Sequence, residues 1–365
     1  MHFHRFHQTL YPSVQAGNIE LATTIRSLLQ AAGAIADKEP SEVDLPCCLD
    51  PHLFAGFTSG HPEFCPAQTL LDTAEERAAC RHRLPTQERG PIPVMGKAHP
   101  VVAAALRHSA GLPAHEPEAV DPARYMPHIE QAWSLIRSAQ PGLFRLLEST
   151  VQHVLLFRSA RLNSFASLSL HGLVGLNIGH GSSLTFFIDD LCHQGGHVIF
   201  NALTSNTARY LNVDAEAPLR LCVNAPDDPR TVYSAFHGLY TYTCILGTLA
   251  KLYGCRQLTP LHRNVALARV LFYLDKFALD VSLLSDPALF TADGRALYDT
   301  LCTGQRILAR QFSSAVGSID LTGQPYVFSE SVLLARNPQL IHDTRESPSI
   351  DQQCKTGQDA TGGPL

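Results

Sequence analysis

The amino-acid sequence predicts a mainly helical α+β protein in which a small β-sheet lies beside one metal-binding helix. Apolar residues recur at helical spacing in several long segments after residue 125, and this periodicity indicates amphipathic helices. Residues 164–178 instead interleave Leu, Val and Ile with Ser and Gly, which is typical of a strand or hairpin. The 365 residues and the 45% hydrophobic content are enough for a large core.

The first third of the chain, residues 1–125, is expected to be an irregular region rich in Pro and His that wraps the remainder or binds the substrate. One helix is predicted over residues 19–36. Frequent prolines then leave room only for short helices, such as one over residues 100–108, because an internal proline removes a backbone hydrogen bond. We expect a helical catalytic domain over residues 126–338 and a disordered tail over 339–365.

Two consecutive helices open the catalytic domain. Ile129, Trp133 and Ile136 fall on one face of the first, Pro141 starts the second, and the apolar pattern continues to residue 155. The strand region then follows the second helix.

Three further helices and one further strand complete the predicted order. Ser183 is a suitable N-cap for a helix over residues 184–204. A short strand is predicted at 219–223, a long apolar helix over 231–253, and another helix over 264–284.

Charge and cysteine usage limit the compartment and the partners. Charged residues make up 17% of the chain and the formal net charge is −5, so nothing favours binding to nucleic acid or to a membrane surface. No stretch approaches the about 18 uninterrupted apolar residues that a membrane span requires, and the first residues lack the apolar core of a signal peptide. None of the ten cysteines has the C-x-x-C spacing of a zinc site. We expect a cytoplasmic protein with reduced thiols.

The segment His193-Gln194-Gly195-Gly196-His197 is the strongest candidate for chemistry. Residues four apart lie on one face of a helix, so the two imidazoles can bind one metal ion. The adjacent glycines cost roughly 1 kcal/mol each relative to alanine. We expect that cost to be tolerated because another backbone or a substrate approaches closely.

The residue after the first histidine decides between metals. In the H-E-x-x-H zinc hydrolases, a glutamate at that position is the base that activates water. Gln194 occupies it here, and an amide does not accept a proton at ordinary pH. Iron-dependent oxidation needs mainly ligands, open positions and orientation, so the sequence favours iron over zinc.

The third ligand stays open at this stage. Asp189 and Asp190 precede His193 by four and three residues, so either carboxylate could complete the ligand set or accept the second N–H of a ligand imidazole. His237 is the other candidate, although a histidine in so apolar a segment is more often a core residue.

The order of these features along the chain is distinctive. A proline joins two helices, a strand region follows, and the H-x-x-x-H helix precedes an Asp-Pro-Arg element and an Ala-Phe-His-Gly-Leu-Tyr segment (Pro141, 168–178, 193–197, 228–230 and 235–240). Over about residues 130–310 this resembles the 2-oxoglutarate-dependent HExxH-type peptide β-hydroxylases, also described as HEXXH-motif peptide-modification proteins. The family's motif glutamate falls on Gln194.

The resemblance implies a mononuclear non-haem Fe(II) dioxygenase that uses 2-oxoglutarate and O₂ to hydroxylate a side-chain carbon of a natural-product precursor peptide. It implies that His193 and His197 bind Fe(II) and that His237 is the third ligand. Gln194 and Asp190 are expected at the catalytic centre.

The distal carboxylate of 2-oxoglutarate would need a cation, and the planar fork of arginine suits that role. Arg230 belongs to the Asp-Pro-Arg element and Arg263 starts the next apolar helix, so we expect these two residues to bind the co-substrate.

Two other functions stay open. The chain could be a zinc-dependent hydrolase that uses another base, or a catalytically inactive binding or scaffolding protein of the same fold.

Overall fold

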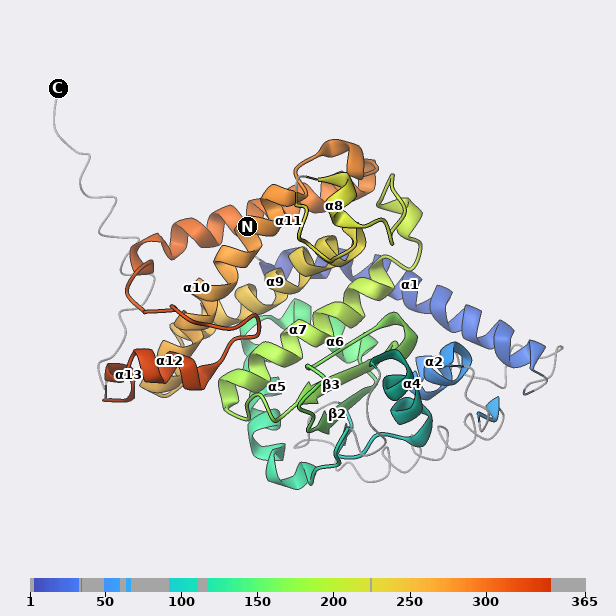
Figure 1. Ribbon diagram of the computed structural model, residues 1–365, viewed down its shortest axis with the longest axis horizontal. Helices are drawn as coiled ribbons and strands as arrows, with labels where there is room; N and C mark the ends of the chain where they lie inside the picture. The colour runs from blue at the N-terminus through green and yellow to red at the C-terminus, as the bar shows by residue number, and fades with distance from the viewer. Residues whose placement is uncertain are drawn as a thin grey trace.

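The computed structural model describes residues 3–32, 34, 49–59, 64–66, 92–110, 117–223 and 225–342. Within them, helices surround one small parallel sheet (Figure 1). The prediction of a mainly helical α+β fold is confirmed.

The sheet lies in the interior, and its three strands are parallel in the order β1-β2-β3, namely β1 (Val94–Met95), β2 (His153–Phe157) and β3 (Leu173–Asn177). Every residue of β2 and β3 is buried. Alternate side chains of β2 enter different cores: Val154 and Leu156 join the main core, whereas Leu155 and Phe157 pack with the short N-terminal helices. The sheet is therefore covered on both faces.

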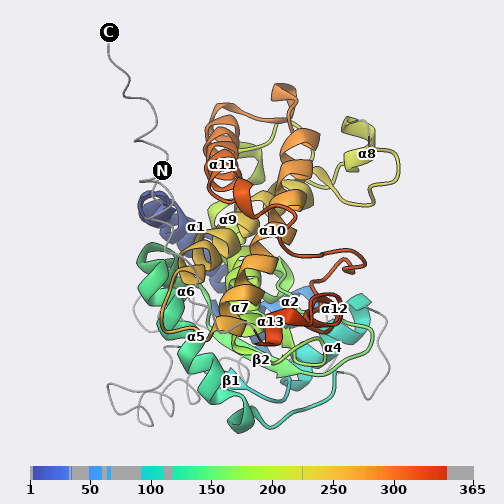
Figure 2. The ribbon, with the colours of Figure 1, turned by 90° about the vertical axis from the view of Figure 1, so that its left-hand side faces the viewer.

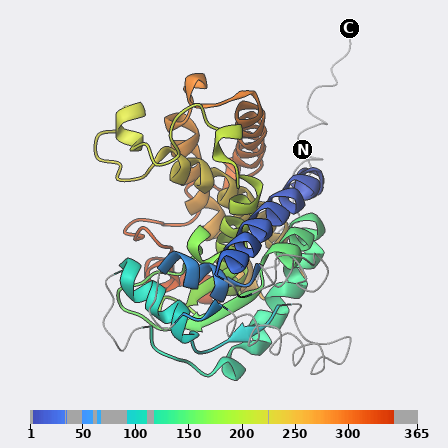
Figure 3. The same cartoon turned by 90° about the vertical axis from the view of Figure 1, so that its right-hand side faces the viewer.

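Helices of different origin cover the two faces. On one face lie α5 (Met126–Ala139), α6 (Pro141–Thr150) and α7 (Leu184–Leu203); on the other lie α2 (Pro51–Ser59) and α4 (Pro100–Ala110). The long helix α1 (Phe3–Ala31) packs on α6 and α7 (Figure 3). The predicted position of the sheet beside the H-x-x-x-H helix is thus confirmed, because β3 packs directly on α7.

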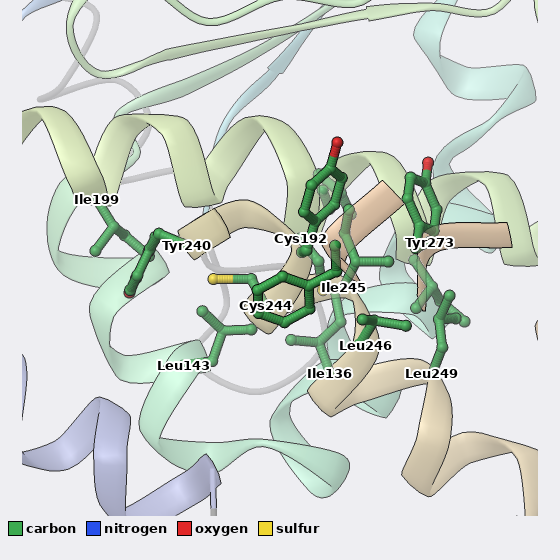
Figure 4. Packing of buried hydrophobic residues seen from close by; sticks show 14 of the residues in the cluster. Ile136, Leu143, Cys192, Ile199, Tyr240, Cys244, Ile245, Leu246, Leu249 and Tyr273 are labelled. Atoms are coloured by element: carbon green, nitrogen blue, oxygen red, sulfur yellow. The ribbon is translucent and has the colours of Figure 1, made fainter. Parts of the chain in front are cut away.

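A second layer of helices packs on the far side of α7. Its long members are α9 (Val232–Tyr253), α10 (Pro260–Leu283) and α11 (Ala292–Gln311), and its short members are α8 (Leu219–Cys222), α12 (Glu330–Arg336) and α13 (Gln339–His342) (Figure 2). The interface between α7 and α9 is a dense apolar core that contains Cys192 and Cys244 (Figure 4). No helix of the described chain has the length and apolar character needed to cross a bilayer.

Three predicted elements were wrong. Residues 153–157 form strand β2 rather than the end of a helix; a strand buried on both faces reads as a continuous apolar run, which periodicity does not separate from a buried helix. Residues 219–222 form a helix rather than a strand. The first helix begins at residue 3 and ends at 31, so the N-terminal region is less irregular than expected. Residues 343–365 of the predicted tail lie outside the described residues.

Candidate functional site

Helix α7 carries most of the predicted site residues, and its start is fixed by two hydrogen bonds. The Ser183 hydroxyl accepts the backbone N–H of Phe186 at 3.2 Å and donates to the Glu330 carboxylate at 2.6 Å. The predicted N-cap is confirmed. This cap fixes the residue at which α7 begins.

The paired glycines allow neighbouring helices to approach α7 closely. A Cβ on Gly195 would lie 2.2 Å from Cδ2 of Leu147 in α6, and one on Gly196 would lie 3.3 Å from side-chain atoms of Thr241 and Cys244 in α9. The glycines are closely approached as expected, but the nearest atoms belong to side chains of packed helices rather than to another backbone or a substrate.

The three predicted histidine ligands meet where α7 crosses α9. The rings of His193 and His197 have their centroids 4.9 Å apart, and the rings of His197 and His237 lie 4.1 Å apart at nearly right angles. Nδ1 of His197 lies 2.9 Å from Nε2 of His237, which is also 3.1 Å from the backbone oxygen of His197. The structure therefore brings together three residues that the sequence separates by 44 positions.

Burial keeps these imidazoles neutral. It lowers the pKa of His193 and lowers that of His197 well below the ordinary value. For His237, burial lowers the pKa to about 3, against a backbone hydrogen bond to His197 that raises it. A neutral imidazole keeps the lone pair that a metal ion requires.

The donor chemistry of the cluster fits a divalent transition metal. Imidazole nitrogens are ordinary ligands of such ions, and Nδ1 of His197 and Nε2 of His237 lie within hydrogen-bond distance of each other. Within the described residues, however, no three His, Cys, Asp or Glu side chains are arranged to hold one ion together. The three rings are neighbours without forming a closed ligand set.

Asp189, one of the alternative third ligands, belongs to a buried ion pair. Its Oδ2 accepts hydrogen bonds from the guanidinium of Arg269 and, at 3.0 Å, from the hydroxyl of Tyr273. Its Oδ1 has no hydrogen-bond partner among the described residues. The ring of Tyr273 in turn lies 6.5 Å from that of His193, so this network adjoins the histidines.

Asp190 faces a different side and is linked to Gln194. It accepts a 2.5 Å hydrogen bond from Ser164, and the Gln194 side chain also hydrogen-bonds to it. Burial and the charge of Asp189 raise the pKa of Asp190 to about 7, although the hydrogen bonds and Arg269 oppose the shift. The two predicted catalytic residues, Asp190 and Gln194, are thus direct neighbours.

The two predicted co-substrate arginines lie elsewhere. Arg230 donates from Nη1 and Nη2 to both oxygens of Asp280 at 2.7 Å, and from Nε and Nη2 to Asp228. Arg263 donates to the backbone oxygen of Leu258 and lies ten residues, about 15 Å along α10, before Tyr273. Their assignment to 2-oxoglutarate stays a prediction, and this placement does not favour it.

Two residues of α10 close to the histidines were not selected from the sequence. Arg269 and Tyr273 lie one turn apart and both face Asp189. Asp189, one turn before His193, was a sequence signal for a partner cation nearby. Its partners belong to another helix, so only the packing of α10 on α7 identifies them.

No protein-family model matches this chain, and no curated protein matches it.

Proposed function

We propose that the chain is a mononuclear Fe(II), 2-oxoglutarate-dependent oxygenase that hydroxylates a side-chain carbon of a peptide. The observation that carries the proposal is the meeting of His193, His197 and His237 at the crossing of α7 and α9, with two ring nitrogens 2.9 Å apart. Gln194 in place of a glutamate base supports oxidation over hydrolysis.

In the proposed reaction, one substrate C–H bond becomes C–OH while 2-oxoglutarate and O₂ become succinate and CO₂. Fe(II), when bound, supplies the oxidising chemistry of this reaction. The residues of the chain would hold and orient the ion, and the three imidazoles are its proposed ligands. The Asp189, Arg269 and Tyr273 network supports the His193 side of the cluster, and Asp190 fixes the Gln194 amide.

Metal binding tests the proposal before any substrate is known. The wild-type chain, loaded with Fe(II) without oxygen, is expected to retain one ion by elemental analysis. His193→Ala, His197→Ala and His237→Ala should each weaken binding at least about 100-fold, because even partners outside the ligand set cost 10–100-fold. The exposed His128→Ala is the matched control and should bind as the wild type does.

Turnover provides the second readout. With Fe(II) and ascorbate, the wild type should convert 2-oxoglutarate to succinate, and the three ligand variants should not. A wild-type protein that retains no more metal than the variants would contradict the proposal and favour a metal-free scaffold.

A zinc-dependent hydrolase is the second candidate, and one observation favours it. Asp190 lies beside Gln194 and hydrogen-bonds to it, so a carboxylate is present next to the position where the zinc hydrolases carry their base. Tightly bound zinc, absent succinate formation and peptide hydrolysis that is lost in Asp190→Asn would establish this alternative.

A further inference from the structure

A cavity of about 580 Å³ lies between the 225–230 loop, α9, α10 and Tyr326. Its wall is mainly apolar, with Pro226, Tyr242, Leu279 and Leu283. The segment around α8 and the segment before α12 lie on the same side of α10 (Figure 2). A volume of this size suits a small organic ligand.

The cavity wall carries three carboxylates and two cations. Asp228 and Asp280 both accept hydrogen bonds from Arg230, so this group of three is held together by its own ion pairs and keeps one formal negative charge. Asp227 is exposed, and water screens its charge.

Lys276 is the cation of the cavity wall whose ammonium has N–H groups that are not used in hydrogen bonds to the protein. Its Nζ donates to the backbone oxygen of Tyr326 and lies 3.9 Å from the Tyr326 ring centroid and 4.6 Å from that of Phe272. Within the described residues it forms no ion pair. Two aromatic faces therefore hold a half-buried ammonium at the cavity, and the other two N–H groups can reach a ligand.

Two residues that line the cavity, Asp280 and Tyr242, adjoin neighbours of the histidine cluster. Gly238, the neighbour of His237, is so close to Asp280 that a Cβ there would lie 3.3 Å from its Oδ2. The Tyr242 ring lies 5.9 Å from that of Tyr273, which contacts His193. Along each of these two paths, two residues lie between the cavity and a histidine.

We propose that this cavity binds an organic acid with an apolar body, whose carboxylate pairs with Lys276 while its body contacts Tyr242, Leu279 and Tyr326. The charge of Asp280 acts on Lys276, but within the described residues the ammonium forms no direct ion pair, so the carboxylate of such a ligand adds a charge-assisted hydrogen bond. The apolar wall excludes a fully hydrated anion. This site does not depend on a bound metal, so it can be tested separately from the proposed function.

The probe is 4-phenylbutyrate, with its amide and its amine analogue, titrated by calorimetry into the metal-free protein. The acid should bind, and the two analogues should bind at least tenfold more weakly. Lys276→Gln should reduce the affinity for the acid at least tenfold, and Lys276→Arg should retain it.

Lys251→Gln is the matched control, because Lys251 also donates to a backbone oxygen, that of Ala139, but lies outside the cavity. At the exposed Leu279, Leu279→Glu should weaken binding of the acid by charge repulsion, whereas Leu279→Gln should change it little. Equal affinity in Lys276→Gln, or tighter binding of the amine than of the acid, would overturn the proposal.

Discussion

Two adjacent aspartates on α7 have opposite electrostatic environments. Asp189 accepts hydrogen bonds from a buried arginine, whereas Asp190 has only neutral donors, Ser164 and Gln194. Neighbouring residues of a helix point about 100° apart, so one faces α10 and the other faces the residues before β3. Burial and the charge of Asp189 raise the pKa of Asp190 to about 7, and the hydrogen bonds from its neutral donors only partly oppose this shift.

Asp189→Asn should destabilise the protein by about 3 kcal/mol or more. The substitution leaves the Arg269 guanidinium, 5% exposed, without a counter-charge, and breaking a buried pair from one side typically costs about 3–5 kcal/mol. Urea unfolding followed by circular dichroism measures the loss.

The exposed pair of Arg209 and Asp293 supplies the control. Its side chains are 58% and 53% exposed, so Asp293→Asn should cost less than about 1 kcal/mol. Equal losses in the two variants would show that burial does not determine the strength of these pairs.

At the scale of elements, α1 docks on the end of α7 through a glycine. A Cβ on Gly17 would lie 1.7 Å from the backbone oxygen of Ala202. Nearby, the Ser205 hydroxyl donates to Glu20 of α1 at 2.7 Å. Helix α1 therefore reaches backbone contact with the helix that carries the candidate ligands.

Gly17→Ala should lower the free energy of unfolding by about 2 kcal/mol, although alanine is the better helix former by about 1 kcal/mol. The added methyl group meets rigid backbone, and such overpacking costs about 1–3 kcal/mol or more. Urea unfolding measures the change. Gly254→Ala, where the nearest atom would be 4.0 Å away, should stay within about 0.5 kcal/mol. A stabilised Gly17→Ala would contradict the close docking of α1.

Helices and strands could be predicted where the residues of the element itself carry a clear apolar pattern or cap. Helices α5, α7, α9 and α10 were predicted to within a few residues because their apolar pattern and caps are local, as at Ser183. Helix α11 (Ala292–Gln311) was not predicted. Strand β2 was missed because burial on both faces removes alternation. The contact of His237 with His197 came from the family resemblance rather than from any pattern in the residues, since it depends on how α9 crosses α7.

At the scale of the whole molecule, several histidines of the described residues lie in the interior, and burial lowers the pKa of His171, His193, His197 and His237. His171 is fully buried, with Nε2 3.3 Å from Oδ1 of Asn18 in α1 and its ring 5.4 Å from that of Phe54 in α2. It therefore joins both N-terminal helices to the sheet. Burial lowers its pKa from 6.5 to about 4.

This pKa predicts an acid-sensitive fold. Below about pH 6.5 the unfolded chain binds a proton at this position, whereas folded His171 stays neutral until about pH 4. The contribution of His171 to the free energy of unfolding is therefore complete above pH 6.5. About 3 kcal/mol of it is lost as the pH falls toward 4. His171→Gln removes the titration, so its free energy of unfolding should fall less steeply over this range. Urea unfolding of both proteins at several pH values measures the difference, and the exposed His128→Gln controls for histidine number. Parallel pH profiles for wild type and His171→Gln would mean that the proton uptake of unfolding occurs elsewhere.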